Sequence, residues 1–217
     1  MKRRPLSVAA AFAATAVLFL TACGGGDGGD GGGGGGSKGS GETSAPPPAS
    51  ASPATDSDRP DIELPADLSY TFDWPRTGDT EKDAVLADSE QSIKAVDLAI
   101  THQNPLDKAY LYYYEGAAAA GTETFVQAYV DAKARVTGSY RYYEAVANVN
   151  GSDRASLVYC EDQSKAYDMY FSPKRVDRTA VTKNSYVLYS TQLHRNDKGV
   201  WVVEKIVSQR GSTECQP

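Results

Sequence analysis

The chain has 217 residues, of which 22 are lysine or arginine and 28 are aspartate or glutamate, so its formal net charge is −6 at pH 7. An acidic chain has no general attraction to nucleic-acid phosphates or to anionic lipid headgroups. This balance excludes proteins that bind nucleic acid by neutralising its phosphates, and any membrane association has to come from another feature. We therefore expect no nucleic-acid partner.

Residues 1–22 have the layout of a bacterial export signal. A basic start with one lysine and two arginines precedes an apolar run, residues 8–20, that is too short to span a bilayer comfortably. The run ends in Leu20-Thr21-Ala22-Cys23, which resembles the lipobox of bacterial lipoproteins. The alternative is an ordinary export signal followed by a chance cysteine, and the Sec and twin-arginine routes both stay open.

The lipobox resemblance implies cleavage before Cys23 and lipidation of that residue. Two or more acyl chains anchor a protein stably where one does not. Cleavage would remove three of the 22 basic residues and none of the 28 acidic ones, so the net charge becomes −9. We therefore predict a protein held by its lipid on the extracytoplasmic face of the cell membrane.

Residues 23–61 are predicted to be a disordered tether. Residues 24–36 are nearly all glycine, and a segment rich in serine, proline, alanine and aspartate follows. Such a composition cannot bury enough apolar area to offset its chain entropy. The predicted organisation is thus a signal peptide (1–22), a lipidated tether (23–61) and one folded domain (62–217).

Cys160 and Cys215 are the two cysteines left once Cys23 is assigned to the lipid. Thiols outside the cytoplasm tend to be oxidised, and an even pair allows one intramolecular disulfide. A catalytic cysteine would need a partner base, and neither histidine lies near Cys160 in the sequence. A zinc site would need ligands at close spacings that the sequence does not have. We therefore predict a disulfide, and we predict neither a metal site nor a cofactor.

The domain is predicted to have helices first and strands afterwards. Residues 80–102 carry apolar side chains at helical spacing, with Asn104-Pro105 as the stop. A second helical run begins at Pro105 and includes residues 110–114, and a third covers residues 122–136.

Beyond Gly138 the apolar pattern changes to a period of two. Asn150-Gly151 is a strong signal for a hairpin between the first two strands, and residues 196–199 form the turn between the last two. In the last strand, Trp201, Val203 and Val207 are predicted to share one face. The four predicted strands are residues 140–149, 154–161, 185–195 and 200–209. We predict an α+β fold in which N-terminal helices pack on a curved antiparallel sheet of about four strands.

This order of helices, hairpin and long strand pair, with Trp201 just past the final turn, resembles the cone-shaped fold of nuclear transport factor 2, ketosteroid isomerase and scytalone dehydratase. Cys160-Glu161-Asp162-Gln163-Ser164, the stretch Asp197-Lys198-Gly199-Val200-Trp201-Val202-Val203 and Cys215 are similar more closely to actinobacterial lipoproteins that carry this fold. The resemblance covers residues 75–215. It implies that Cys160 pairs with Cys215, and that a homodimer can form through the open face of the sheet.

The resemblance also implies a pocket at the open end of the cone, where enzymes of this fold use a histidine or an aspartate aided by tyrosine hydroxyls. The ionisable candidates here are Asp97, His102, Asp131 and His194. Both aspartates lie among polar helical positions and are expected to be exposed. His102 lies at a helix end, where a cation suits the dipole, and His194 precedes a turn, where we expect solvent around it. We therefore predict no catalytic residue.

The chain has 14 tyrosines, and a tyrosine that buries its ring and keeps its hydroxyl wet suits a pocket rim. Tyr112, Tyr129, Tyr142 and Tyr189 are the predicted pocket or rim residues. The alternative is that these rings simply fill the core of a domain with few phenylalanines.

Two functions from different classes follow from the sequence. The leading prediction is a non-enzymatic binding or scaffolding domain of the cell envelope, with an envelope protein or a small ligand as its partner. The other is an isomerase, dehydratase or cyclase that uses a tyrosine-lined pocket. A solute-binding lipoprotein that feeds a transporter is disfavoured, because the chain has length for one lobe and such proteins usually close two.

Overall fold

Residues 58–217 are the part of the chain that the computed structural model describes. The predicted export signal, the lipidation of Cys23 and the tether up to residue 57 lie outside the described residues. No helix between residues 58 and 217 has both the length and the apolar character needed to cross a membrane. The helices and strands are β1 (Leu68–Asp73), α1 (Thr80–Thr101), α2 (Lys108–Leu111), α3 (Gly116–Ala132), β2 (Ala134–Asn150), β3 (Arg154–Phe171), β4 (Lys174–Asp177), β5 (Tyr186–Arg195) and β6 (Trp201–Arg210).

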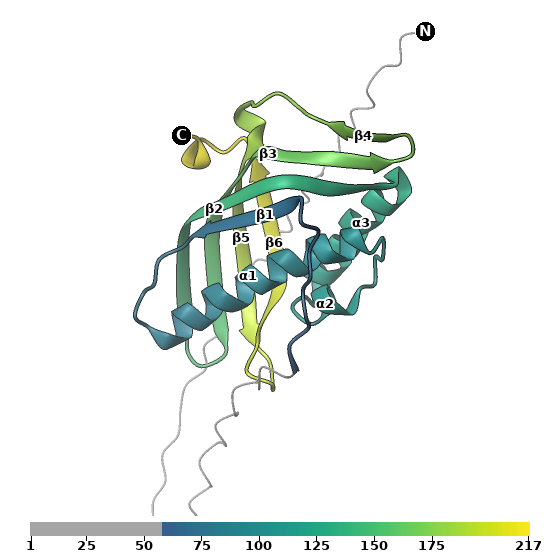
Figure 1. Ribbon diagram of the computed structural model, residues 1–217. Helices are drawn as coiled ribbons and strands as arrows, with labels where there is room; N and C mark the ends of the chain where they lie inside the picture. The colour runs from purple at the N-terminus through teal and green to yellow at the C-terminus, as the bar shows by residue number, and fades with distance from the viewer. Residues whose placement is uncertain (1–57) are drawn as a thin grey trace, which may run out of the picture. The chain divides into compact units, whose positions relative to one another are not determined.

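The predicted α+β class is confirmed: helices cover one side of a curved sheet (Figure 1). The sheet has six strands, with the order β1-β2-β3-β5-β6 and with β4 paired to β3. The pairs from β2 to β6 are antiparallel, as predicted, whereas β1 pairs with β2 in parallel. The two strands beyond the predicted four are β1 and β4.

Long, bent strands give the sheet its curvature. β2 has 17 residues and β3 has 18, well above the usual length of about 5 to 6 residues. Their register shifts between Ser139 and Arg141 and again between Tyr143 and Val146. Such bulges bend a strand and increase its twist, so the β2–β3 pair arches over the helices (Figure 1).

The helices agree with the sequence in number but not in every boundary. Asp79 caps α1 by accepting hydrogen bonds from the backbone N–H groups of Glu81 and Lys82. α2 is only four residues long, because Tyr114 already forms a bridge with Val203 of β6. α3 ends at Ala132 and not at residue 136, since Lys133 adopts the left-handed conformation and β2 begins directly afterwards.

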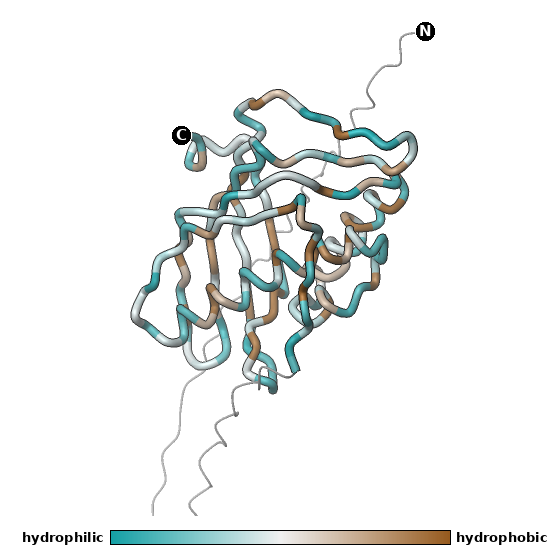
Figure 2. Tube along the Cα trace, viewed as in Figure 1, coloured by the Kyte–Doolittle hydropathy of each residue, from teal (hydrophilic) through white to brown (hydrophobic). Residues whose placement is uncertain are grey.

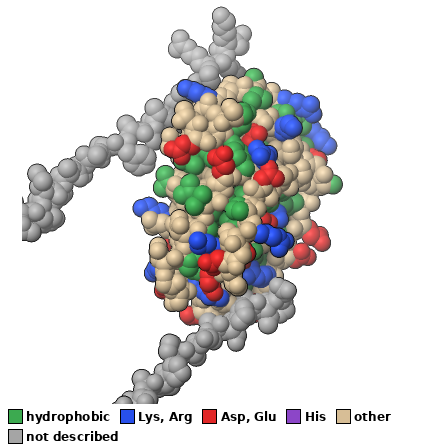
Figure 3. All heavy atoms as spheres, turned by 90° about the vertical axis from the view of Figure 1, so that its left-hand side faces the viewer, with side chains coloured by type: hydrophobic (Ala, Val, Ile, Leu, Met, Phe, Trp, Pro, Cys, Tyr) green, Lys and Arg blue, Asp and Glu red, His purple; other side chains and the backbone are tan. Residues whose placement is uncertain are grey.

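The core lies between the helices and the concave face of the sheet. In Figure 2 the apolar stretches run along strands and helices, while the turns are hydrophilic. Trp201 is completely buried, and its backbone N–H donates a 2.8 Å hydrogen bond to Asp88 of α1. Asp88 also pairs with Arg59, which ties the segment before β1 to the same helix. On the face in Figure 3, acidic and basic side chains are interspersed around apolar ones, so this face has no field of a single sign.

The disulfide between Cys160 and Cys215 is present, as predicted. It joins the central strand β3 to the last turn of the chain, and the two Cα atoms are 5.4 Å apart. Both side chains are buried. A cross-link over 55 residues stabilises a fold by about 4 kcal/mol in the chain-entropy account.

Candidate functional site

A cavity of about 360 Å³ lies between α1, α3 and the concave face of the sheet. We call it the tyrosine cavity. A second hollow, of about 330 Å³, shares Phe125, Tyr140, Gln163 and Arg210 with it, so the two adjoin. The aromatic residues that line the tyrosine cavity are Tyr114, Phe125, Tyr140, Tyr142, Tyr159 and Tyr189.

The rings on the sheet side are held in place by stacking. Tyr142 stacks on Phe72 of β1 with ring centroids 4.8 Å apart, and Tyr159 stacks on Tyr189 at 5.1 Å. Offset-stacked rings of this kind add to the stability that area burial alone provides. The aromatic wall is therefore preorganised by contacts among β1, β2, β3 and β5.

Glu161 of β3 projects into this wall and is 5 % exposed. The Tyr142 hydroxyl donates to its Oε1 at 2.8 Å, and the Gln163 amide donates to its Oε2 at 2.5 Å. Burial raises the pKa of Glu161, while these hydrogen bonds and the charge of Arg210 oppose the rise. A proton is therefore held more tightly here than on an exposed glutamate.

Asp97 of α1 also lines the tyrosine cavity, and it is 8 % exposed. The prediction that this residue is exposed was wrong. Asp97 lies four residues after Ile93 and three before Ile100, so it falls on the buried stripe of the helix. Tyr70 of β1 compensates the burial, because its hydroxyl donates to Asp97 Oδ2 at 2.5 Å.

Burial raises the pKa of Asp97 to about 7. The Tyr70 hydrogen bond opposes this rise, and the negative charge of Glu161 adds to it. A carboxyl group that titrates near neutral pH can both accept and donate a proton. The tyrosine cavity thus combines an aromatic wall with two carboxyl groups that are neutral more often than exposed ones.

The four predicted rim tyrosines lie in different places. Tyr142 and Tyr189 line the tyrosine cavity. Tyr129 lines the adjoining hollow, and its hydroxyl donates to Asp168 at 3.1 Å. Tyr112 lines neither hollow and packs edge to face on Tyr113. The structure thus brings together two of the four, and their role in binding stays a prediction.

The other predicted candidates lie outside the tyrosine cavity. His102 follows the end of α1, as expected, and its Nδ1 lies 2.8 Å from Asp107. Asp131 is exposed, as expected, and accepts a hydrogen bond from Gln127. The expectation of solvent around His194 was wrong, because its side chain is only 18 % exposed and lies between Glu115 and Glu204.

Sequence reasoning missed Glu161 as a site residue. Glu161 directly follows Cys160, and this stretch was interpreted in terms of the disulfide. The signal that could have found it is the strand pattern: in an alternating strand, Glu161 shares a face with the buried Tyr159 and Leu157.

No protein-family model matches the sequence, and no curated protein matches it. The fold is similar to three solved structures at low identity. A ketosteroid isomerase-like protein from Erwinia carotovora atroseptica has a TM-score of 0.41 and 10% identity, covering 61% of this chain and 97% of that one. The intermembrane space region of the chloroplast protein ARC6 has a TM-score of 0.41 and 11% identity, covering 63% and 99%. The association domain of C. elegans CaMKII has a TM-score of 0.34 and 13% identity, covering 60% and 99%. These likenesses concern the backbone arrangement and say nothing about a ligand or an activity.

Proposed function

We propose that this protein is a lipid-anchored domain of the bacterial cell envelope that binds a small molecule in the tyrosine cavity. The observation that carries the proposal is the convergence of Asp97 and Glu161 on a hollow of about 360 Å³. Protein interiors are normally close-packed, and buried carboxyl groups lower stability. Perturbed carboxyl groups around an open hollow are typical of functional sites.

The lining favours a compact ring-bearing ligand that is neutral or cationic. Aromatic faces attract rings and cations, and the two carboxyl groups accept hydrogen bonds from hydroxyl or amino groups. Arg210 brings one positive charge to a lining that holds two carboxyl groups, and its Nη1 already donates to Gln163 and to the backbone oxygen of Asn184, each at 2.8 Å. Anionic ligands are therefore disfavoured.

Two tryptophan substitutions on one helix test the binding site. Thr122 of α3 is buried and lines the tyrosine cavity, whereas Thr124 is exposed on the same helix. A fragment library of neutral rings, amines and carboxylates would be screened by ligand-observed NMR. Amines and neutral rings should bind the wild type and Thr124→Trp, and their signals should vanish with Thr122→Trp. Binding that survives Thr122→Trp, or a preference for carboxylates, would overturn the proposal.

The membrane anchor has its own test, because it rests on the sequence around Cys23. Cys23→Ala should move the protein from the membrane fraction to the soluble fraction and remove the acyl mass from the mature N-terminus. The binding of fragments should not change, because the tether contributes nothing to the tyrosine cavity in this proposal. Wild-type protein without acyl groups by mass spectrometry would refute the anchor and leave the binding site standing.

General acid–base catalysis is the second candidate function, and the pKa of Asp97, raised to about 7, favours it. A group with this pKa can remove a proton from a carbon acid and return it at another atom near neutral pH. Small enolisable ketones in D2O provide a direct probe, since proton removal exchanges hydrogen for deuterium. Exchange that is faster with wild type than with Asp97→Asn would support catalysis. Equal rates would leave binding as the function.

A further inference from the structure

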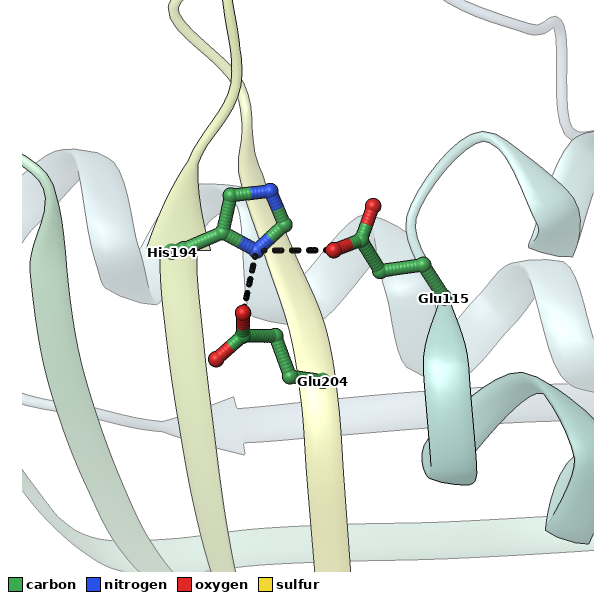
Figure 4. Close-up of side chains that lie close together, drawn as sticks. All are labelled: Glu115, His194 and Glu204. Atoms are coloured by element: carbon green, nitrogen blue, oxygen red, sulfur yellow. Dashed lines mark ion pairs between the residues drawn. The ribbon is translucent and has the colours of Figure 1, made fainter.

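Three ligand-type side chains meet at a place that the tyrosine cavity does not include. His194, Glu115 and Glu204 point toward one another in Figure 4. His194 Nδ1 lies 3.3 Å from an oxygen of Glu115 and 3.4 Å from an oxygen of Glu204. One donor atom from each residue lies within 4.8 Å of the other two.

The fold brings these residues together from three elements. His194 lies near the end of β5, opposite Val202 of β6. A register shift between Gln192 and Leu193 leaves Glu204 as the extra residue of a bulge in β6, and bulges re-aim side chains. The stretch before α3 is fixed to the same strand, because the Glu115 backbone N–H donates to the Val203 oxygen at 3.0 Å.

Of the three side chains, Glu204 is engaged locally, because both of its oxygens accept hydrogen bonds from Arg154. Local structure makes little use of the other two. Glu115 occupies the position before α3, yet its side chain forms no capping hydrogen bond. His194 Nδ1 is buried and has no hydrogen-bond partner among the described residues. Buried polar atoms are nearly always satisfied, so an orphaned ring nitrogen between two carboxylates requires an explanation.

We propose that Glu115, His194 and Glu204 bind a divalent transition-metal ion, with Zn²⁺ as the preferred test ion. Zinc binds histidine nitrogen and carboxylate oxygen at about 2.0 to 2.2 Å in tetrahedral geometry, which places neighbouring ligand atoms about 3.3 to 3.6 Å apart. The two separations from His194 Nδ1, 3.3 and 3.4 Å, match these edges. They exceed the usual N–H···O distance of about 2.9 to 3.0 Å.

The other histidine of the chain, His102, shows the geometry of an ordinary hydrogen bond between a histidine and a carboxylate. His102 Nδ1 lies 2.8 Å from one oxygen of Asp107, as a single hydrogen bond requires. His194 instead lies at nearly equal, longer distances from two carboxylates. This arrangement surrounds a point between three atoms, where a cation would lie.

Charge and access are compatible with a bound dication. A neutral histidine, two carboxylates and the Arg154 guanidinium that pairs with Glu204 carry a net charge of about −1, so the cluster still attracts a cation. Arg154 donates to both oxygens of Glu204, but each carboxylate oxygen has two lone-pair sites and can still bind the ion. The side chains of Glu115 and Glu204 are 52 % and 34 % exposed, which leaves an entry route. Three protein ligands leave one position open for water or a substrate.

The test is a calorimetric titration of the purified domain with Zn²⁺, accompanied by Co²⁺ absorption spectroscopy. The wild type should bind one ion at micromolar concentration or better, and Co²⁺ should give the intense visible bands of a tetrahedral site. Glu115→Gln and His194→Ala should each weaken binding at least about tenfold. His102→Ala is the matched control and should bind like the wild type.

Two results would overturn the site. One is wild-type protein that binds no Zn²⁺ at millimolar concentration, and the other is equal affinity of wild type and Glu115→Gln. Circular dichroism of the metal-free variants checks that they fold. If His194→Ala does not fold, Glu115→Gln still tests the site, because Glu115 is half exposed and glutamine has nearly the same shape. Fragment binding in the tyrosine cavity is a separate readout, so failure of one site does not decide the other.

Discussion

Tyr142 and Glu161 lie directly opposite each other in the β2–β3 ladder, and the Tyr142 hydroxyl donates a 2.8 Å hydrogen bond to Glu161. Opposite residues of an antiparallel pair point to the same face of the sheet. The register that buries the aromatic ring therefore also buries the carboxyl group. The pairing of β2 with β3 thus forms the wall of the tyrosine cavity and also orients the carboxyl group of Glu161.

Tyr142→Phe should show how much this hydrogen bond stabilises the ionised form of Glu161. Loss of the donor should raise the pKa of Glu161 further, because the bond favours the charged carboxylate. The free energy of unfolding should fall by about 1 to 3 kcal/mol at pH 8 and by less at pH 4, where the carboxyl group is protonated. Urea unfolding at the two pH values measures the difference. Tyr170→Phe, on the same strand as Glu161, is the control, and an equal loss at both pH values would contradict the expectation.

Asp97 should make the domain less stable as the pH rises. Its pKa is raised from 3.8 to about 7 in the folded chain, so between these values the folded state holds a proton that the unfolded state has lost. The free energy of unfolding therefore decreases as the pH rises through this interval. The destabilisation is absent below pH 3.8 and complete above about pH 7.

Asp97→Asn removes this titration and should make the fall in stability between pH 4 and pH 7 smaller, while the fall that Glu161 causes remains. A shift of about three pKa units corresponds to at most about 4 kcal/mol, so the variant should be the more stable protein at pH 8 by up to that amount. Chemical unfolding across the pH range measures it, with Asp131→Asn as the exposed control. Parallel profiles for wild type and Asp97→Asn would show that Asp97 ionises normally.

The disulfide should contribute a stability that does not depend on pH near neutrality. Replacing both Cys160 and Cys215 with serine should lower the free energy of unfolding by about 4 kcal/mol, because the unfolded chain regains its loop entropy. Wild-type protein in a reductant should lose a similar amount, while the double variant should not respond to the reductant. If the reductant also destabilises the double variant, the loss of stability in the wild type cannot be assigned to the disulfide.

Local patterns were sufficient for the elements that depend on neighbouring residues. Asn150-Gly151 does form the turn between β2 and β3, and α1 begins at Thr80 and ends one residue before His102, where the helical pattern indicated. These signals succeed because turn conformation and helical spacing are set within a few residues. The pairing of Cys160 with Cys215 was also predictable, since the predicted export and the even number of remaining cysteines both indicated it.

Long-range pairing was not predictable in the same way. β1 joins the sheet in parallel with β2, and nothing near Leu68 specifies a partner about 70 residues later. The bulge at Glu204 shifts the alternation of β6 by one residue. Val207 was expected to share a face with Trp201, but it is 56 % exposed, and Ile206 lines the tyrosine cavity in its place.

Long-range contacts also explain why Asp97 and His194, both named as candidates, were wrongly expected to be exposed. Asp97 carries a charge on a helix, which indicates exposure unless a distant group such as Tyr70 compensates its burial. His194 and Glu115 are separated by many residues, so their proximity leaves no spacing in the sequence. The tyrosine cavity lies between α1, α3 and the concave face of the sheet, whereas His194, Glu115 and Glu204 meet where β5, β6 and the start of α3 come together.

Gly138 should be the least replaceable glycine of the described residues, because a side chain there has no room. Its φ is +98°, and a Cβ atom would lie 2.1 Å from the backbone oxygen of Lys165 in the neighbouring strand. Gly138→Ala should lower the free energy of unfolding by roughly 3 kcal/mol or more, from strain and from displacement of β3. Gly151→Ala is the matched control, since φ is +69° at that turn but nothing lies within 4 Å of the added Cβ atom.

The control should lose only about 1 to 2 kcal/mol, the usual penalty of a left-handed residue. The difference between the two variants therefore measures the clash between β2 and β3, separate from backbone strain. Urea unfolding of both variants gives that difference. Equal losses would mean that the strands separate at little cost, and the β2–β3 ladder that carries Tyr142 and Glu161 would then be less rigid than its register indicates.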